Sequence, residues 1–116
     1  MKRCNNVEAK FFIPNLKDFT NGTGSFIGIV EDRTHDTVHT YRVYSYNTCI
    51  AEYRNGEWII NRTKYSVTTT RHQNIVAYSL DVPWGNGNHW RDALLVYDIP
   101  RGENRLYWYL ERNKIV

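Results

Sequence analysis

The sequence predicts an α+β fold in which strands dominate, with about seven mostly antiparallel strands and one short helix near residues 71–80. Segments rich in β-branched and aromatic residues recur along the chain, and such residues are typical of strands. Asn55-Gly56 stands between two apolar segments, which predicts a tight hairpin. One segment, after Thr70, instead places its apolar residues at helical spacing.

The size and composition of the chain favour one domain over residues 1–116. Its 116 residues are 41% hydrophobic and 15% aromatic, so large rings can supply much of the volume of a core. No stretch approaches the roughly 18 consecutive apolar residues that a membrane helix requires, so no membrane contact is expected.

The N-terminal part is predicted to hold two strands. Met1–Glu8 is expected to be a loose lead-in to a short aromatic strand at Ala9–Ile13. Pro14 should end that strand, because proline fixes φ and lacks an N–H donor. Ser25–Glu31 is predicted as the next strand, and Gly28 within it indicates a bulge or a close approach of another chain segment.

The middle of the chain predicts a central strand and a meander. Thr37–Tyr46 carries β-branched and aromatic residues on both of its faces, as expected of a strand that is covered on both sides. Ile50–Tyr53 and Glu57–Ile60 flank Asn55-Gly56 and should form the hairpin, because Asn and Gly tolerate the positive φ angles of a tight turn. Lys64–Val67 is predicted to add a further strand.

The helix is predicted over Arg71–Leu80, with Pro83 closing the segment. Thr70 and Gln73 match a capping box, in which each side chain accepts a hydrogen bond from a backbone N–H at the helix start. One helical face then carries His72, Ile75, Val76, Ser79 and Leu80.

Two more strands are predicted at the C-terminal end. Ala93–Ile99 is apolar and rich in strand-forming residues, and the turn at residues 100–104 separates it from Arg105–Glu111. The last segment would carry Leu106, Trp108 and Leu110 on one face and Arg105, Tyr107, Tyr109 and Glu111 on the other.

The most distinctive pattern is a tryptophan in a hairpin, an asparagine, and then Tyr-Ser-x-Thr-Thr-x-x-His-Gln where a strand gives way to a helix. In this chain it consists of Trp58, Asn61, Tyr65, Ser66, Thr68, Thr69, His72 and Gln73. Through these residues, over about Tyr44 to Ile75, the chain resembles a family of small uncharacterised proteins encoded by bacterial phages and plasmids. The resemblance implies a mobile-element origin and brings no activity with it.

The hydroxyl-rich start of the predicted helix admits three interpretations. The hydroxyls could cap the helix beside a partly buried His72. His72 could instead be a general base next to a hydroxyl nucleophile. Finally, the helix N-terminus could bind an anion with the help of Arg71.

The segment Pro83–Arg91 is rich in glycine and carries two large rings. Its tryptophans either fold back onto the sheet or act as anchors for a partner, because Trp and Arg dominate interface hot spots. The candidate partner-binding residues are Trp84, His89, Trp90 and Arg91.

The charge balance is mildly basic, since 15 Lys and Arg against 12 Asp and Glu give a net charge of +3. The cations are scattered and not gathered in one segment, which favours dispersed surface charge. Aromatic and basic residues on one sheet face could nevertheless stack bases. The candidate contacts for an anion or a nucleic acid are Arg71, His72, Tyr107 and Tyr109.

No metal, cofactor or catalytic residue set is predicted. His35 and His39 are four residues apart, a spacing that suits a metal pair only on a helix, and His89 brings no supporting carboxylate or cysteine. The two cysteines, Cys4 and Cys49, and the polar residues after Met1 favour a reducing cytoplasm, here that of a bacterial host cell.

Three functions remain in view. The favoured one is a non-catalytic binding protein of a mobile element, for example an anti-CRISPR-like inhibitor of a host defence nucleoprotein, with a host protein or ribonucleoprotein complex as its partner. The second is a mildly basic module for single-stranded nucleic acid. The third is a small toxin-type ribonuclease that uses His72 with Arg71 and Tyr65.

Overall fold

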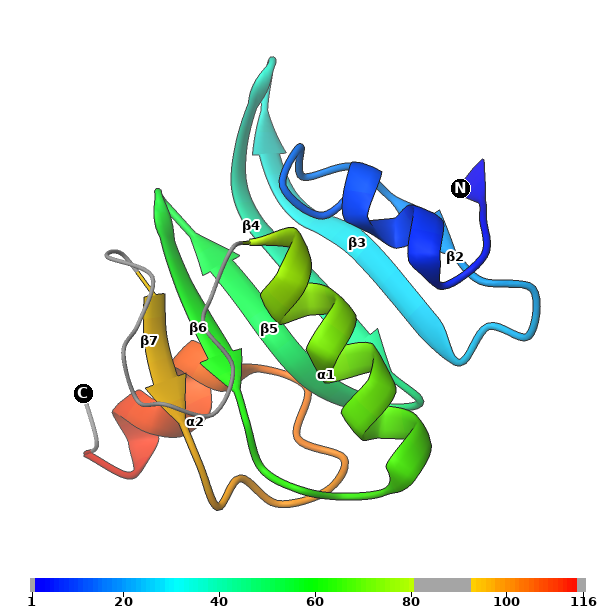
Figure 1. Ribbon diagram of the computed structural model, residues 1–116. Helices are drawn as coiled ribbons and strands as arrows, with labels where there is room; N and C mark the ends of the chain where they lie inside the picture. Colours follow the sequence, from blue (N-terminus) through cyan, green and yellow to red (C-terminus); the bar gives the residue numbers. More distant parts are fainter. Residues whose placement is uncertain (1, 81–92, 115–116) are drawn as a thin grey trace.

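The computed structural model describes residues 2–80 and 93–114, which form one seven-stranded sheet with helices on both faces (Figure 1). The strands lie side by side in chain order and are β1 (Lys2–Arg3), β2 (Phe19–Thr20), β3 (Phe26–Thr34), β4 (Thr37–Ser45), β5 (Thr48–Arg54), β6 (Glu57–Asn61) and β7 (Ala93–Val96). The helical segments are the 3-10 helix η1 (Val7–Phe11) and the α-helices α1 (Val67–Ser79) and α2 (Leu106–Arg112). The predicted β-dominant α+β class is confirmed.

The sheet is mostly antiparallel, as predicted. Strands β2 to β6 form antiparallel neighbours. The two outermost strands are parallel to the strands beside them, β1 to β2 and β7 to β6. Helix α1 stands between β6 and β7 in the chain, so the parallel pair β6–β7 follows the usual pattern of a strand, a helix and a second strand. No helix among the described residues has the length and apolar character needed to cross a membrane.

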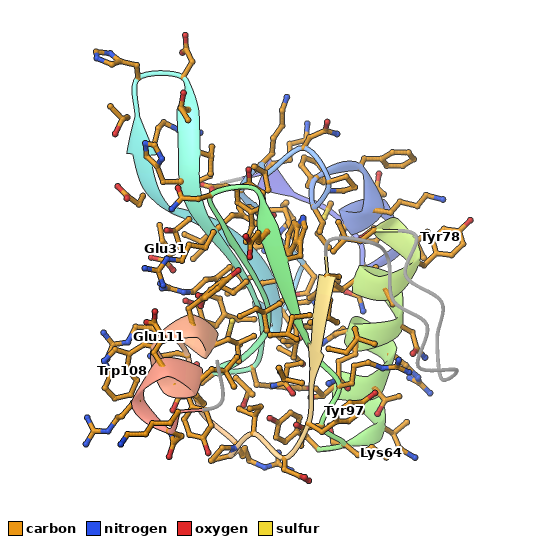
Figure 2. The ribbon with its side chains drawn as sticks, turned by 90° about the vertical axis from the view of Figure 1, so that its left-hand side faces the viewer. Glu31, Lys64, Tyr78, Tyr97, Trp108 and Glu111 are labelled. Atoms are coloured by element: carbon orange, nitrogen blue, oxygen red, sulfur yellow. The ribbon has the colours of Figure 1, made fainter. Side chains whose placement is uncertain are left out.

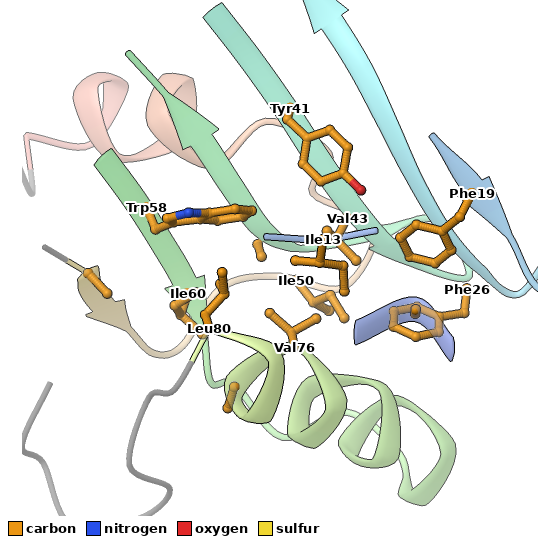
Figure 3. Close-up of a cluster of buried hydrophobic side chains, with 14 of the residues drawn as sticks. Ile13, Phe19, Phe26, Tyr41, Val43, Ile50, Trp58, Ile60, Val76 and Leu80 are labelled. Atoms are coloured by element: carbon orange, nitrogen blue, oxygen red, sulfur yellow. The ribbon is translucent and has the colours of Figure 1, made fainter. Parts of the chain in front are cut away.

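Two apolar clusters hold the three layers together. The larger one lies between the sheet and the helices α1 and η1, and Figure 3 shows its rings and aliphatic side chains gathered between the strands and α1. The smaller one packs α2 against the opposite face of the sheet and consists of Cys49, Ile59, Val96, Ile99, Leu106 and Leu110. Helices α1 and α2 therefore cover opposite faces, as Figure 2 shows with the sheet between them.

The central strand and the hairpin match the predictions. Strand β4 lies between β3 and β5, and its residues Tyr41, Val43 and Ser45 are buried. Asn55 and Gly56 connect β5 and β6 with φ angles of 50° and 93°, the positive values that a tight hairpin turn requires.

Gly28 marks a close approach of side chains from two neighbouring strands. A Cβ atom at this position would overlap the hydroxyl of Tyr41 and the ring of Phe19. The irregular pairing of β3 with β4 lies further on, between Val30 and Arg33. Of the two predicted explanations for Gly28, the close approach is correct.

The N-terminal prediction is wrong in two respects. Residues 9–13 form no strand, because η1 occupies Val7–Phe11 and buries Ala9, and the turn that follows it buries Ile13. A reciprocal pair starts this helix, since the Asn5 N–H donates to Glu8 Oε1 (2.9 Å) and the Glu8 N–H donates to Asn5 Oδ1 (2.8 Å). The segment before it is not loose either, because β1 pairs with β2 and the side chain of Cys4 is buried.

The boundaries around α1 also differ from the prediction. The helix begins at Val67 instead of Arg71, so no strand forms at residues 64–67. The cap is Ser66, whose Oγ accepts a hydrogen bond from the N–H of Thr69 at 3.1 Å. The Thr70–Gln73 capping box is therefore wrong, and both residues lie inside the helix.

The predicted last strand, Arg105–Glu111, is the helix α2. Leu106 and Leu110 lie one helical turn apart and are both fully buried. Glu52 on β5 stabilises the start of this helix. Its carboxylate accepts hydrogen bonds from the N–H groups of Leu106 (2.9 Å) and Tyr107 (3.1 Å). These are N–H groups that a helix start leaves without partners of its own.

Candidate functional site

The residues of the pattern from Trp58 to Gln73 form a buried hydrogen-bond network between β6 and α1. The Asn61 amide donates from Nδ2 to the carbonyl of Cys49 (3.0 Å) and to the Tyr65 hydroxyl (2.9 Å). The Tyr65 hydroxyl in turn donates to the carbonyl of Ile99 at 2.6 Å. Asn61 and Tyr65 thereby join three segments that are distant in the chain.

Gln73 ties α1 to the end of β6. Its Nε2 donates to the carbonyls of Asn61 (2.8 Å) and Thr63 (2.9 Å), and its side chain is buried. Buried carbonyls need such partners, because an unsatisfied buried polar group is costly. The glutamine of the pattern thus fixes where α1 starts relative to the sheet.

His72 lies inside the core. Its ring stacks on Phe26 with centroids 4.4 Å apart, and its Nδ1 lies 2.7 Å from the Oγ of Ser45. Ser45 donates to Thr69 Oγ1 (3.0 Å), an arrangement that places the imidazole proton on Nδ1 of His72. The side chain is only 1% exposed, and burial lowers the pKa of His72 to about 4, so the ring is neutral at physiological pH.

This geometry bears on two of the three interpretations of the helix start, the capping network and the general base. The capping hydroxyl and the buried histidine agree with a structural network. Arg71, by contrast, is exposed on α1, and the Tyr65 hydroxyl is held by Ile99 and Asn61. The structure therefore does not bring His72, Arg71 and Tyr65 together on an accessible surface.

The other predicted site residues are separated from one another. Tyr107 and Tyr109 lie on α2 and are half-buried, and both pack against the smaller apolar cluster. Among the described residues, no group of three His, Cys, Asp or Glu side chains could hold a metal ion. The predicted partner-binding residues Trp84, His89, Trp90 and Arg91 lie outside the residues that the structure describes.

Two surface features stand out that the sequence did not predict. The first, here called the η1–α1 patch, consists of Val7, Lys10, Phe11, Ile75 and Tyr78. Three of these side chains are large, apolar and well exposed: Val7 and Phe11 at 62% each and Tyr78 at 75%. The ammonium of Lys10 lies 5.2 Å from the ring centroid of Phe11 and 5.9 Å from that of Tyr78.

The local fold explains why these rings face outward. The 3-10 helix turns Ala9 into the core, and α1 does the same with Val76 and Ala77. The intervening residues of both helices, Val7, Phe11 and Tyr78 among them, are consequently left on the outer side. Figure 2 shows the Tyr78 ring on the outer side of α1, away from the sheet.

The second feature, here called the α2 groove, is a polar hollow of about 530 Å³ between the strands and α2, on the other side of the sheet. Glu52 lies at its floor and is 1% exposed. Its lining consists of Asp32, His39, Thr40, Arg42, Glu52, Arg54, Asn55, Arg105, Tyr107, Trp108 and Glu111.

The arginines in and beside the groove differ in their partners, which are carboxylates for two of them and the Trp108 ring for two others. Arg42 donates from Nε to Glu52 (2.8 Å), and Arg54 lies 3.6 Å from Glu111 and over the ring of Tyr107. Arg105 and Arg112 instead stack on Trp108, at 4.6 and 5.0 Å from the ring centroid. Burial raises the pKa of Tyr107 to about 12, so its hydroxyl stays protonated.

One sequence signal could have pointed to the groove. Glu52 directly follows the apolar segment Cys49–Ala51, and a buried carboxylate needs several donors. The exposure of Val7, Phe11 and Tyr78 has no comparable signal, because much of any folded surface is apolar and the sequence does not say which apolar residues stay exposed.

The chain matches a family of unknown function, DUF8033, over residues 14–82, which is more than half of its length. It belongs to this family. The matched residues begin after η1, run through α1 and include the Asn61, Tyr65 and Gln73 network, so the family region contains most of the larger core. No curated protein and no solved structure matches the chain significantly.

Proposed function

We propose that this DUF8033 protein acts by binding another protein, without catalysis, through the η1–α1 patch. One observation carries the proposal: two large rings, Phe11 and Tyr78, each more than 60% exposed, lie against a single ammonium group, with the exposed side chain of Val7 in the same patch. Contiguous apolar surface of this kind is uncommon on monomers and is typical of contact sites.

The patch defines the chemistry of its partner. Phe11 and Tyr78 offer large rings that gain free energy when a partner removes them from water. Lys10 lies against both rings, and a carboxylate on the partner would pair with it inside the contact. The partner surface should therefore combine an apolar side chain with a neighbouring Asp or Glu.

The proposed partner is a protein of a host defence ribonucleoprotein, and the proposed place of action is the cytoplasm of a bacterial host. The support for this class is the resemblance of residues 44–75 to small phage- and plasmid-encoded proteins. An anti-CRISPR-like inhibitor would need only to cover a working surface of such a complex. A compact binding protein suffices for that.

The test compares capture from a host lysate by the wild-type protein and by the double variant Phe11→Ser/Tyr78→Ser. We expect the wild type to retain a protein that the variant loses, with affinity at least about tenfold weaker when the purified pair is measured, because hot-spot rings contribute about 2 kcal/mol or more. Nuclease treatment should leave the complex intact.

The matched control is Tyr46→Ser/Tyr97→Ser. It also removes two exposed aromatic rings, here two tyrosines that are each 53% exposed and lie outside the patch. It should bind like the wild type. Lys10→Glu should weaken binding, and reversing a carboxylate on the partner to lysine should restore it. Equal capture by the patch variant and the wild type would refute the proposal, as would turnover of RNA or DNA by the purified protein.

A further inference from the structure

We propose that Arg105, Trp108 and Arg112, together with the adjoining α2 groove, bind the phosphate backbone of single-stranded nucleic acid. This surface is independent of the η1–α1 patch, because α2 lies on the opposite side of the sheet (Figure 2). The argument rests on how the arginines are held, on their charge partners and on the donors and acceptors of the groove.

Stacking holds the two guanidinium groups in place while leaving their donors available. The guanidinium carbons of Arg105 and Arg112 lie 4.6 and 5.0 Å from the centroid of the Trp108 ring. A stacked guanidinium keeps its N–H groups in its own plane, where they form a fork that matches two phosphate oxygens. Such a side chain loses less conformational freedom on binding than a free one.

The guanidinium groups of the same two arginines have no carboxylate partner among the residues that the structure describes, although the backbone N–H of Arg105 donates to Glu103 Oε2 (3.3 Å). Arg42 is paired with Glu52 and lies 3.9 Å from Glu31, and Arg54 is near Glu111. For Arg105 and Arg112 the described contacts of the guanidinium groups are with the Trp108 ring. Their positive charge is therefore available to an external anion.

The groove beside them favours nucleic acid over an acidic peptide. Asp32 and Glu111 line it and repel any anionic group, so a ligand whose anions lie at the arginines must present neutral donors to these carboxylates. Nucleobases carry N–H groups, including the ring N3–H of uracil and thymine, that can donate to these same carboxylates, while the phosphates of the strand meet the arginines. Base edges are free to do so in a single strand, and the exposed part of Trp108 offers a surface for stacking.

The experiment measures fluorescence anisotropy of labelled U15 RNA and T15 DNA with the full-length protein at low salt. We expect the double variant Arg105→Gln/Arg112→Gln to bind at least about tenfold more weakly than the wild type. The slope of log K against log salt should fall by about 1.4, or about 0.7 for each lost phosphate contact on a single strand. Circular dichroism confirms that the variant is folded.

The matched control, Lys17→Gln/Lys64→Gln, removes the same charge from two exposed residues outside the groove. It should bind within about twofold of the wild type, since phosphate contacts at a defined site are not replaced by charge elsewhere. Trp108→Phe should bind better than Trp108→Ala, because phenylalanine keeps a ring for stacking.

The proposal fails if the wild type binds neither oligonucleotide, or if the control loses as much affinity as the α2 variant. It also fails if poly-glutamate binds at this surface and the oligonucleotides do not. A wild-type protein that captures a nuclease-resistant protein partner through Tyr78 but binds no oligonucleotide would overturn this inference alone and leave the proposed function standing.

Discussion

His72 belongs to the pattern from Trp58 to Gln73, and its side chain is buried in the core. Its ring stacks on Phe26, and its Nδ1 is hydrogen-bonded to Ser45. Its Nε2 has no hydrogen-bond partner within the described residues. A neutral ring tolerates this, because Nε2 is then an acceptor without a proton. A second proton would create a buried charge with no carboxylate to balance it.

This arrangement predicts a pH dependence of stability. The pKa of His72 is about 4 in the folded protein, against an ordinary value of 6.5, so between these values the unfolded chain binds the extra proton. Stability from this group is complete above pH 6.5 and falls as the pH drops toward 4, by up to about 3 kcal/mol. Urea unfolding at pH 7 and pH 4.5 measures the difference.

The control for this prediction is His72→Gln, whose amide can still bond Ser45 but does not titrate. Its stability should change less between the two pH values than that of the wild type. The nuclear magnetic resonance shifts of the His72 ring provide a second measurement, and they should titrate below pH 5. A ring that titrates near pH 6.5 would contradict the prediction.

At the scale of elements, the two hydroxyl residues Ser66 and Thr70 have different roles at the start of α1. Ser66 accepts from the N–H of Thr69, so Ser66→Ala should lower the free energy of unfolding by about 1 kcal/mol. Thr70 donates to the carbonyl of Ser66 from within the helix, and Thr70→Ala should cost less than about 0.5 kcal/mol, since alanine is a better helix former. Urea unfolding of both variants measures which loses more stability. A larger loss for Thr70→Ala would mean that Thr70, and not Ser66, caps the helix.

The elements also show how far the sequence determines the fold. The Asn55-Gly56 hairpin and strand β4 were predictable, because their turn residues and β-branched segments are local signals. The segment from Arg105 to Glu111 was not, since Leu106 and Leu110 satisfy both a strand's alternation and a helix's spacing of four. What selects the helix is the carboxylate of Glu52, which is distant in sequence.

The candidate surfaces were harder to predict than the fold. Arg105 and Trp108 are adjacent on α2 only because that segment is helical, and a strand there would have placed them on opposite faces. The η1–α1 patch unites residues 7–11 with residues 75–78, and this contact follows from the packing of two helices on one sheet. Tyr107 was predicted as a contact residue and does line the groove, although from a helix.

At the scale of the whole molecule, the sheet divides the two proposed surfaces. The η1–α1 patch lies on the side of the larger cluster, and the α2 groove lies on the side of the smaller one (Figures 1 and 2). Strands β5 and β6 are buried on both faces and contribute side chains to both clusters. Each surface thus rests on its own packed layer.

This division predicts that the two binding events are independent. Adding Tyr78→Ser to Arg105→Gln/Arg112→Gln should leave oligonucleotide affinity unchanged from that of the double variant. Saturating T15 DNA should change the affinity for the protein partner by less than about twofold, because effects at sites without shared contacts add to within about 0.5 kcal/mol. Anisotropy titrations with and without the other ligand measure the coupling. A coupling above about 1 kcal/mol would mean that a single ligand reaches around the edge of the sheet, or that binding at one face rearranges β5 and β6 beneath the other.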